Sequence, residues 1–317
     1  MSIAARFSVP LRVFIAGATG VVGRTLLSSL QQRGHHVTAL LRAANAEAAT
    51  GADDVAVADV LELPQLRRVL RDSAPDVVVA QVSGFRAEDY DDALDRTAQL
   101  WGLGTRNLVR AARDAGVNRV VAQSTVEAYY PNGHDVLDED SPLWTDAPGR
   151  WGELVRAVAD LEDAVLEHDG VVLRYGSLYG PDTWYAPGGR IHEQVRGSAL
   201  PLVDDGVGLT SFTHVDDAAS AVAEVLSAGE SGIYNVVDNE PAEYAEWLPA
   251  YARMVGGPAP VSLTLEQARA QLDWLTVHRL TEQRGATNFR LRETLGWRPM
   301  WPSWREGFAT LFGLWPG

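Results

Sequence analysis

The first half of the chain alternates short runs of β-branched and other apolar residues with longer segments whose apolar residues recur at helical spacing. The predicted strands cover residues 11–16, 37–41, 55–58, 77–80, 119–123 and 171–174. The predicted helices between them cover 22–33, 64–72, 93–115 and 154–168. Because the strand runs are apolar on both faces, this alternation favours an α/β fold in which helices cover both sides of a doubly wound parallel sheet.

The pattern changes after residue 174. Residues 175–189 are rich in Gly, Pro and aromatic side chains, which is typical of a loop that lines a site. Further strands are expected at 212–214 and 233–237 with a helix at 215–226, and helices dominate from residue 241 onward. We therefore predict a Rossmann domain at 1–175, to which 212–238 returns, and a small C-terminal substrate-binding lobe formed by 176–211 and 239–317.

A glycine-rich loop with the sequence GATGVVG joins the first predicted strand to the first predicted helix. Gly17 permits the tight turn, Gly20 lets the backbone approach a pyrophosphate, and Gly23 allows close packing of helix on strand. The N-terminus of the following helix presents free N–H groups and a positive dipole end to the phosphates. The predicted pyrophosphate site consists of Gly17, Thr19, Gly20, Val21, Val22 and Gly23.

The end of the second predicted strand usually decides which ribose is bound. An acidic residue there accepts from the 2′-hydroxyl of NAD, whereas an arginine suits the 2′-phosphate of NADP. This strand is followed by Arg42, with no acid before Glu47, and Arg24 adds a positive group after the loop. The sequence therefore favours NADP, with NAD as the alternative if Arg42 is a solvated surface residue.

Composition narrows the classes of partner. The chain has 42 acidic and 27 basic residues and a net charge of −15, which disfavours nucleic acid and anionic membrane surfaces and leaves a small molecule as the expected substrate. It has no cysteine, so disulfides and thiolate chemistry are excluded, and no His/Asp/Glu grouping has metal-ligand spacing. No apolar run reaches the roughly 20 residues of a membrane-spanning helix. No secretory signal is recognisable, so we expect a cytoplasmic protein.

Further motifs follow the glycine loop in order. They are GTRNL at 104–108, VLRYGSLYGP at 172–181, THVDDA at 213–218, GIYNV at 232–236 and LGWRP at 295–299. With these motifs the chain resembles, over nearly its whole length, the extended short-chain dehydrogenase/reductase family, also called the NAD-dependent epimerase/dehydratase family. The resemblance implies that Asp59 and Val60 lie at the adenine, that Gln81 lies in the turn after the fourth strand, and that Tyr175 lies beneath the nicotinamide.

The resemblance fails at the catalytic positions. The family uses a Tyr as general acid/base, a Lys four residues later that lowers its pKa, a Ser or Thr, and often an Asn. Thr125 occupies the Ser/Thr position. When the helix is aligned on Glu162, Leu154 stands at the Tyr position and Val158 at the Lys position, and Trp101 stands at the Asn position. Conventional carbonyl reduction or alcohol oxidation is therefore not expected, because removing such a group costs orders of magnitude in rate.

A different proton-transfer group is expected after the fifth strand. The segment Thr125-Val126-Glu127 is similar to the Thr-Asp-Glu triplet of sugar-nucleotide 4,6-dehydratases, whose Glu removes a proton next to a carbonyl. We predict Thr125 and Glu127 as catalytic residues. The alternative is that Glu127 pairs with an arginine or faces solvent.

The Gly/Pro-rich segment is expected to supply the substrate wall. Its candidate residues are Ser177, Tyr185, Arg190 and His192. Arg190 is suited to a carboxylate or phosphate, and His192 to moving a proton. Ordinary surface or core placement is the alternative for each of the last three.

Three functions fit these observations. The first is an NADP-binding epimerase/dehydratase-like enzyme that acts on a small metabolite or biosynthetic intermediate with a non-standard acid/base site. The second is an isomerase or cyclase of the same fold that uses no hydride transfer; Trp144, Trp151 and Trp184 would suit an aromatic or polyketide-like substrate. The third is a catalytically silent NADP-responsive binding protein. The retained motifs between 175 and 217 favour an enzyme, and the resemblance allows a homodimer formed through the helices at 93–115 and 154–168.

Overall fold

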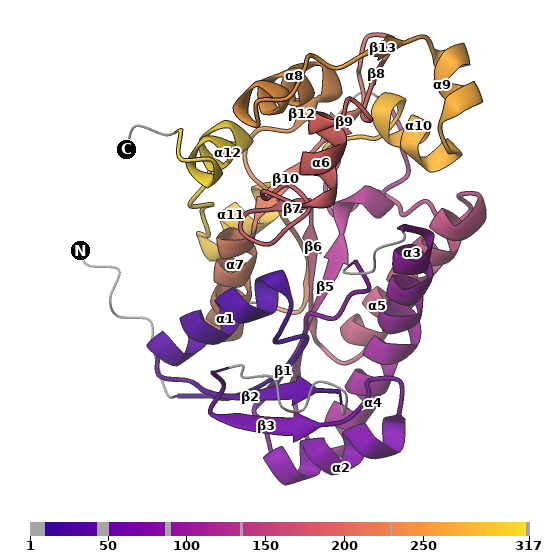
Figure 1. Ribbon diagram of the computed structural model, residues 1–317. Helices are drawn as coiled ribbons and strands as arrows, with labels where there is room; N and C mark the ends of the chain where they lie inside the picture. The colour runs from indigo at the N-terminus through magenta and orange to yellow at the C-terminus, as the bar shows by residue number, and fades with distance from the viewer. Residues whose placement is uncertain (1–9, 43–50, 86–89, 134–135, 229, 315–317) are drawn as a thin grey trace. The chain divides into compact units, whose positions relative to one another are not determined.

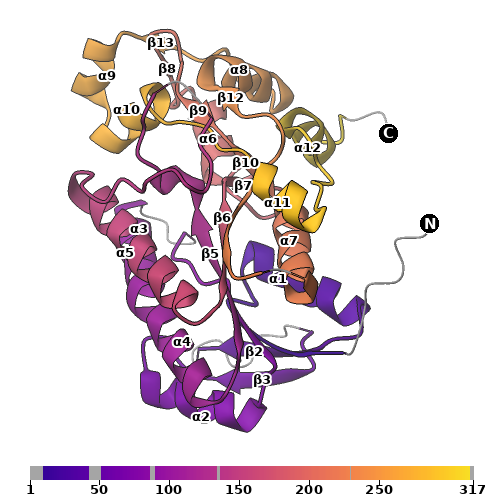
Figure 2. The same ribbon diagram turned by 180° about the vertical axis from the view of Figure 1, so that it is seen from behind.

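The computed structural model describes residues 10–42, 51–85, 90–133, 136–228 and 230–314. The chain forms two compact units, and Figures 1 and 2 show its path from opposite sides. The first unit consists of Met1–Ala128, Leu143–Arg174 and Ala218–Tyr234. The second consists of Tyr129–Pro142, Tyr175–Asp217 and Asn235–Gly317.

The core of the first unit is a seven-stranded sheet with the order β11-β6-β5-β4-β1-β2-β3. Neighbouring strands from β3 through β2, β1 and β4 to β5 pair in parallel. This arrangement confirms the predicted doubly wound α/β fold. The strands are β1 (Arg12–Ala16), β2 (His36–Leu41), β3 (Asp54–Val57), β4 (Val77–Ala80), β5 (Arg119–Thr125), β6 (Val171–Tyr175) and β11 (Gly232–Val236).

Helices cover both faces of this sheet (Figures 1 and 2), as the alternating pattern predicts. Each buries an apolar stripe, such as Leu26, Leu27 and Leu30 of the first helix. The long predicted helix at 93–115 is divided by a π-helical turn, labelled η2. The helices are α1 (Val21–Gln32), α2 (Leu63–Ser73), α3 (Tyr90–Gln99), η2 (Leu100–Gly104), α4 (Thr105–Asp114), α5 (Gly149–Leu166) and α7 (Val215–Ala228).

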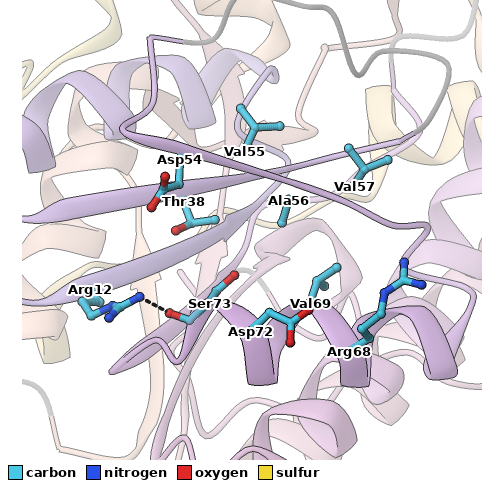
Figure 3. A pocket seen from close by; sticks show the side chains of 10 residues that line it. All are labelled: Arg12, Thr38, Asp54, Val55, Ala56, Val57, Arg68, Val69, Asp72 and Ser73. Atoms are coloured by element: carbon cyan, nitrogen blue, oxygen red, sulfur yellow. Dashed lines mark hydrogen bonds between the residues drawn. The ribbon is translucent and has the colours of Figure 1, made fainter.

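The edge strand β3 departs from the apolar pattern of the interior strands. Val55 and Val57 are 49% and 38% exposed, because one side of an edge strand has no neighbour. Val55 and Val57 also belong to the lining of a groove of about 450 Å³ between the sheet and α2. Figure 3 shows Thr38, Ala56 and Arg68 among the other lining residues. None of the predicted site residues lines this groove.

The second unit combines short strand pairs with small helices. β7 (Ser177–Tyr179) pairs in parallel with β10 (Phe212–His214), and β8 (Leu202–Val203) with β13 (Ser262–Leu263). β9 (Leu209–Thr210) pairs antiparallel with β12 (Ala242–Glu243). The helices are α6 (Arg190–Arg196), α8 (Tyr244–Met254), α9 (Leu265–Gln271), α10 (Trp274–Thr281), α11 (Phe289–Leu295) and α12 (Trp304–Leu311).

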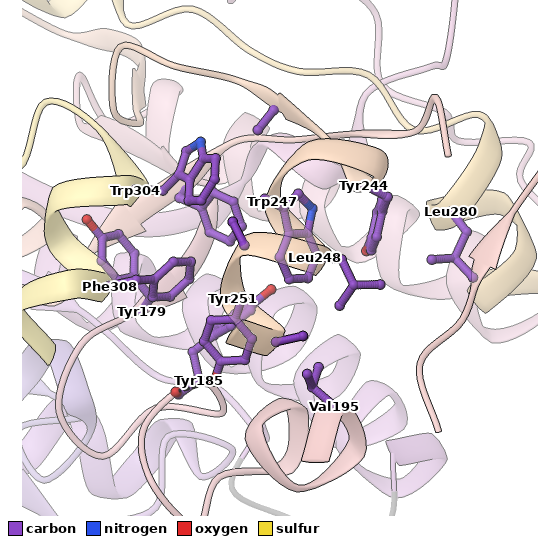
Figure 4. Close-up of a cluster of buried hydrophobic side chains, with 14 of the residues drawn as sticks. Tyr179, Tyr185, Val195, Tyr244, Trp247, Leu248, Tyr251, Leu280, Trp304 and Phe308 are labelled. Carbon is purple, nitrogen blue, oxygen red and sulfur yellow. Dashed lines mark hydrogen bonds between the residues drawn. The ribbon is translucent and has the colours of Figure 1, made fainter. Parts of the chain in front are cut away.

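Aromatic side chains form the core of this second unit (Figure 4). Trp247, Trp304 and Phe308, which are labelled in Figure 4, are 0–1% exposed. The ring of Phe212 lies 5.3 Å from that of Phe308 in an edge-on arrangement. Such edge-to-face contacts add to the energy of burying large apolar surfaces. Within the described residues, no helix is long and apolar enough to cross a membrane.

Candidate active site

The glycine loop lies at the carboxyl end of β1, beside β4. A dinucleotide is expected at this point of the sheet because the strand order reverses between these two strands. Gly17 has φ +93°, and a Cβ atom added to it would lie 2.1 Å from the carbonyl oxygen of Gln81. A Cβ at Gly23 would lie 2.1 Å from the carbonyl oxygen of Gly17. The fold itself therefore requires glycine at these two positions.

Gly20 differs from its two neighbours in the motif. A Cβ there would approach protein atoms only to 3.2 Å, at the oxygen of Gly17, so packing alone demands glycine less strongly. Gly20 is the N-cap of α1, where no side chain caps the helix and the first turn carries no acidic residue. Uncapped N–H groups beside a residue without a side chain fit a pyrophosphate.

The loop after β3 is fixed from α4. The side-chain amide of Asn107 donates to the carbonyl oxygens of Val60 and Leu61, at 3.1 Å in each case. The carboxylate of Asp59 accepts from the N–H of Leu61 at 3.0 Å. A Cβ at Gly104 would come within 3.1 Å of the Val60 side chain. The predicted adenine contacts, Asp59 and Val60, are therefore held in one rigid turn by the GTRNL segment.

Arg42 and Gln81 follow β2 and β4 respectively. Arg42 is exposed directly after its strand, and residues 43–50 lie outside the described residues. The backbone N–H of Gln81 donates to the carbonyl oxygen of Ala16 at 2.8 Å, which continues the pairing of β4 with β1 into the glycine loop.

The structure brings the two predicted catalytic residues together at the end of β5. Thr125 is the last residue of the strand, and Glu127 lies in the 3₁₀ turn η3 (Val126–Ala128) that follows. The N–H of Glu127 donates to the hydroxyl oxygen of Thr125 at 3.2 Å. Both side chains are half-buried.

Leu154 and Val158 are fully buried on α5. Four residues further along, Glu162 accepts from the hydroxyl of Ser124 at 2.8 Å and from Arg174 at 2.8 and 2.6 Å. This buried bidentate ion pair fixes α5 against β5 and β6. Because residues four apart share a helix face, Leu154 and Val158 lie on the same buried stripe as Glu162.

Trp101 lies in the π-helical turn η2 and is 3% exposed. Its indole N–H donates to the carbonyl oxygen of Val82 at 2.8 Å, and its ring packs edge-on against Phe85. The side-chain amide of Gln123 donates to the same oxygen at 2.8 Å. The single polar group of Trp101 is thus used by the backbone. Together with Leu154 and Val158, it leaves these three positions without a titratable side chain.

The predicted residues of the second unit fall into two groups. Tyr185 and His192 are 7% and 6% exposed. The ring of Tyr185 packs edge-on against Phe212 at 5.6 Å, and His192 stacks on Phe312 and lies 2.9 Å from a carboxylate oxygen of Glu193. Both side chains contribute to packing within this unit, and their contact with a substrate stays a prediction.

Ser177 and Arg190 are half-buried, whereas Tyr175 is 3% exposed. Ser177 is anchored through its backbone N–H, which donates to the carbonyl oxygen of Ser211 at 2.8 Å. Arg190 begins α6, and its guanidinium lies 6.0 Å from the ring centre of Trp184. Among the side chains predicted to form the substrate wall, Ser177 and Arg190 are therefore the two that are partly exposed.

Asp217 has a role that the motif alone does not reveal. Its carboxylate accepts from the backbone N–H groups of Met300 and Trp301, at 2.6 and 3.1 Å. Burial raises the pKa of Asp217 to about 6, against the lowering effect of these two hydrogen bonds. Through Asp217, the THVDDA segment thus holds the two residues that follow the LGWRP motif at the start of α7 by hydrogen bonds.

The comparison with known proteins matches this geometry to one family. The model of the NAD dependent epimerase/dehydratase family matches residues 13–237. A 3-diazoavenalumate denitrifying reductase from a Streptomyces species is 47% identical over 304 residues, which cover 94% of this chain and 99% of that protein. A 4-hydroxy-2-methyl-3-oxo-4-farnesyl-3,4-dihydroquinoline-1-oxide ketoreductase from Stigmatella aurantiaca is 30% identical over 82% of this chain and 78% of its own length.

The fold is also found among solved structures. UDP-glucose 4-epimerase from Thermus thermophilus, solved in complex with NAD, superimposes with a TM-score of 0.71. The comparison covers 96% of this chain and 99% of the epimerase chain, at 24% identity. The two chains therefore share their fold over nearly their whole length.

Proposed function

The chain belongs to the NAD-dependent epimerase/dehydratase family, and from that premise we propose that it is a reductase that removes the diazo group from a small carboxylate-bearing aromatic metabolite. One observation carries the proposal: the 47% identity to a diazo-removing reductase extends over nearly the full length of both chains. The aliphatic side chains at the Tyr and Lys positions supply independent chemical support.

The chemistry of such a reaction explains why those positions can be aliphatic. When bound in its reduced form, a nicotinamide dinucleotide would supply a hydride. At an aryl diazonium carbon a C–H bond then forms and the C–N bond breaks, and N₂ leaves with the electrons of that bond. ArN₂⁺ and H⁻ become ArH and N₂, so no proton is gained or lost.

Carbonyl reduction has a different requirement. The developing alkoxide must receive a proton, and a positioned phenol is the kind of group that supplies it. Leu154 and Val158 have no proton to transfer and are fully buried. Reductive loss of N₂ is therefore compatible with this site, whereas conventional carbonyl reduction is not.

The chain's own residues have binding and shielding roles in this proposal. The backbone of the GATGVVG loop and the N-terminus of α1 hold the pyrophosphate. The buried Trp101, Leu154 and Val158 fill the positions of the family's polar groups with side chains that hold no water, which would otherwise replace the diazo group with a hydroxyl. Arg190 is the proposed partner of the substrate carboxylate, because a guanidinium matches a carboxylate bidentately.

We propose that the guanidinium of Arg42 binds the 2′-phosphate of NADP. Replacing Arg42 with Ala should weaken NADPH binding about tenfold or more and leave NADH binding nearly unchanged, because a charge-assisted hydrogen bond contributes about 1.5–3 kcal/mol. Fluorescence titration with both cofactors measures the two affinities, and the exposed Arg110→Ala on α4 serves as the control. Equal loss for NADPH and NADH would remove Arg42 from cofactor selection.

The activity is tested with purified protein, NADPH or NADH, and 4-carboxybenzenediazonium as the probe. We expect one benzoate and one N₂ for each reduced cofactor consumed, at a rate above that of a protein-free control. A panel of aldehydes and ketones should give no turnover. Turnover of carbonyl substrates alone, or no diazo reduction by protein that binds the cofactor, would contradict the proposal.

A second candidate function rests on Thr125 and Glu127. The backbone N–H of Glu127 donates to the Thr125 hydroxyl oxygen directly after β5, and the proposed role of the half-buried Glu127 carboxylate is proton abstraction in an epimerase- or dehydratase-like reaction. Replacing Glu127 with Gln should abolish such an activity and leave diazo reduction with more than half its rate. Loss of diazo reduction in this variant would assign Glu127 to that reaction instead.

A further inference from the structure

Every basic residue of this chain other than histidine is an arginine. The 27 residues counted as Lys and Arg include no lysine, and the chain has no cysteine. Its 317 residues therefore carry neither a side-chain primary amine nor a thiol. Guanidinium groups remain protonated in proteins, so their nitrogens offer no nucleophilic lone pair.

This composition bears directly on the proposed substrate class. An aryl diazonium ion adds to a thiolate to give Ar–N=N–S–R, and to a neutral amine to give Ar–N=N–NH–R with loss of a proton. It also couples to a ring carbon of a phenolate or an imidazole, where a C–N bond replaces a C–H bond and a proton leaves. Each of these additions would consume the substrate and modify the protein.

We infer that the chain is built without the side-chain amines and thiols that would trap an electrophilic diazo substrate, and that the exposed ring of Tyr130 is the principal place where coupling can still occur. This inference rests on the proposed function, because that function supplies the electrophile. It states that the protein resists covalent modification by its own substrate, and it assigns Tyr130 as the site where modification still occurs.

The burial of the other phenols supports the inference. The hydroxyl of Tyr129 donates to the side-chain oxygen of Asn235 at 2.8 Å, and that of Tyr251 donates to the carbonyl oxygen of Tyr185 at 2.6 Å. Burial raises the pKa of Tyr179 and of Tyr251 above that of a free phenol, which lowers the fraction of the reactive phenolate. The buried tyrosines are Tyr129, Tyr175, Tyr179, Tyr185, Tyr234, Tyr244 and Tyr251, and Tyr90 is half-buried.

Tyr130 differs from these residues because it is 42% exposed, directly after the buried Tyr129. Among the described imidazoles, His36 has a comparably exposed side chain, at 45%, and one of its ring nitrogens lies 2.7 Å from Asp54. His134 lies outside the described residues. Coupling is therefore expected first at Tyr130 and secondarily at His36.

The same logic applies to the residues at the family's catalytic positions. A Tyr and a Lys at these positions would add a phenol and an amine to the chain, whereas the fully buried Leu154 and Val158 offer only alkyl groups. The adjacent Thr125 carries a hydroxyl, which is neutral and a far weaker nucleophile than a thiolate or phenolate. Losing the proton-transfer pair thus also removes two groups that the electrophile would attack.

The test uses the full chain, 4-carboxybenzenediazonium and intact-protein mass spectrometry without added cofactor. One variant changes the exposed residues Arg110, Arg253 and Arg269 to lysine, which restores amines at constant charge. A second, Thr125→Cys, restores a thiol at the site, and Thr125→Ser is its size-matched control. Fragment spectra locate each adduct and separate Tyr130 from His134.

We expect the natural chain to gain adducts at Tyr130 and His36 and to lose them in Tyr130→Phe and His36→Gln. The lysine variant should gain up to three further adducts. Thr125→Cys should be modified at Cys at least about tenfold faster than Thr125→Ser is modified anywhere near the site, because a positioned nucleophile gains a high effective concentration.

Three results would overturn the inference: extensive modification of the natural chain at other residues, no adduct at Tyr130, or no additional adducts in the lysine and cysteine variants. The readout does not require turnover. A natural chain that is modified only at Tyr130 and His36, but releases no N₂ when reduced cofactor is added, would contradict the proposed function and leave this inference standing.

Discussion

The indole N–H of Trp101 donates to the backbone carbonyl oxygen of Val82 at 2.8 Å, an oxygen that also accepts from Gln123. Replacing Trp101 with Phe keeps the ring and removes one of two hydrogen bonds, so unfolding should become easier by only about 0.5–1.5 kcal/mol. Trp101→Ala should cost about 3–5 kcal/mol because it opens a cavity. Denaturant unfolding measures the free energy of unfolding of both variants. Equal losses of stability would contradict the claim that packing of the Trp101 ring contributes more than its hydrogen bond.

The ion pair between Glu162 and Arg174 should be costly to break from one side. Arg174→Met leaves a buried carboxylate without its main partner and should lower the free energy of unfolding by about 3–5 kcal/mol. The double variant Glu162→Leu, Arg174→Met removes both charges and should recover much of that loss. A double variant less stable than Arg174→Met would show that the charge left unpaired is not the source of the cost.

The glycines of the loop should separate folding from binding. Gly17→Ala introduces a Cβ at φ +93° and 2.1 Å from a backbone oxygen, so it should destabilise the chain by about 1–3 kcal/mol or more. Gly20→Ala, whose Cβ would lie 3.2 Å from the Gly17 oxygen, should destabilise the chain less than Gly17→Ala but bind the dinucleotide about tenfold or more weakly, a loss of about 1.4 kcal/mol. Thermal unfolding and cofactor titration test the pair, and a Gly20→Ala protein with normal affinity would exclude close pyrophosphate approach at this residue.

Asp217 should make stability depend on pH in an unusual direction. Its pKa of about 6 lies above the value near 4 of an unfolded aspartate, so its favourable contribution is complete below pH 4 and is lost as the pH rises through 6. The loss amounts to about 3 kcal/mol at most. The stability difference between the natural chain and Asp217→Asn, followed from pH 4 to 7, isolates this residue.

Asp217→Asn has a cost of its own, since the amide offers one acceptor oxygen to the two N–H groups of Met300 and Trp301. It should be the less stable protein by about 1–2 kcal/mol below pH 4, and the gap should narrow as the pH rises. The exposed control Asp205→Asn should track the natural chain. A gap that widens with rising pH would mean that the carboxylate is stabilised in the folded chain.

The parallel sheet was predictable from sequence because buried strands and the helices between them have distinct periods. The π-helical turn at Trp101 was not predictable. It has no periodic signature, and it depends on packing against a distant helix, where a Cβ on Gly102 would contact Ala157 at 3.4 Å. The short strands of the second unit are likewise fixed by partners far along the chain, such as Ser262 beside Leu202.

The candidate site was predictable to the extent that its requirements are local. The steric demands on Gly17 and Gly23 arise within a few residues and the adjoining strand, so the motif identifies them. The surroundings of Tyr185 and His192 depend on α8 and the chain end, because Tyr251 and Phe312 cover them. Loop composition therefore indicates where a substrate wall lies, but not which of its side chains are used for packing.

The most direct test follows the hydrogen that replaces the diazo group. The reaction is run in ordinary water with reduced cofactor deuterated at both C4 positions, and again in D₂O with unlabelled cofactor. Transfer of hydride to the carbon that loses N₂ predicts one deuterium in the benzoate ring in the first case and none in the second. Deuterium from D₂O in the benzoate ring would contradict the claim that the new C–H bond is formed by hydride transfer from the cofactor and needs no proton from the protein or solvent.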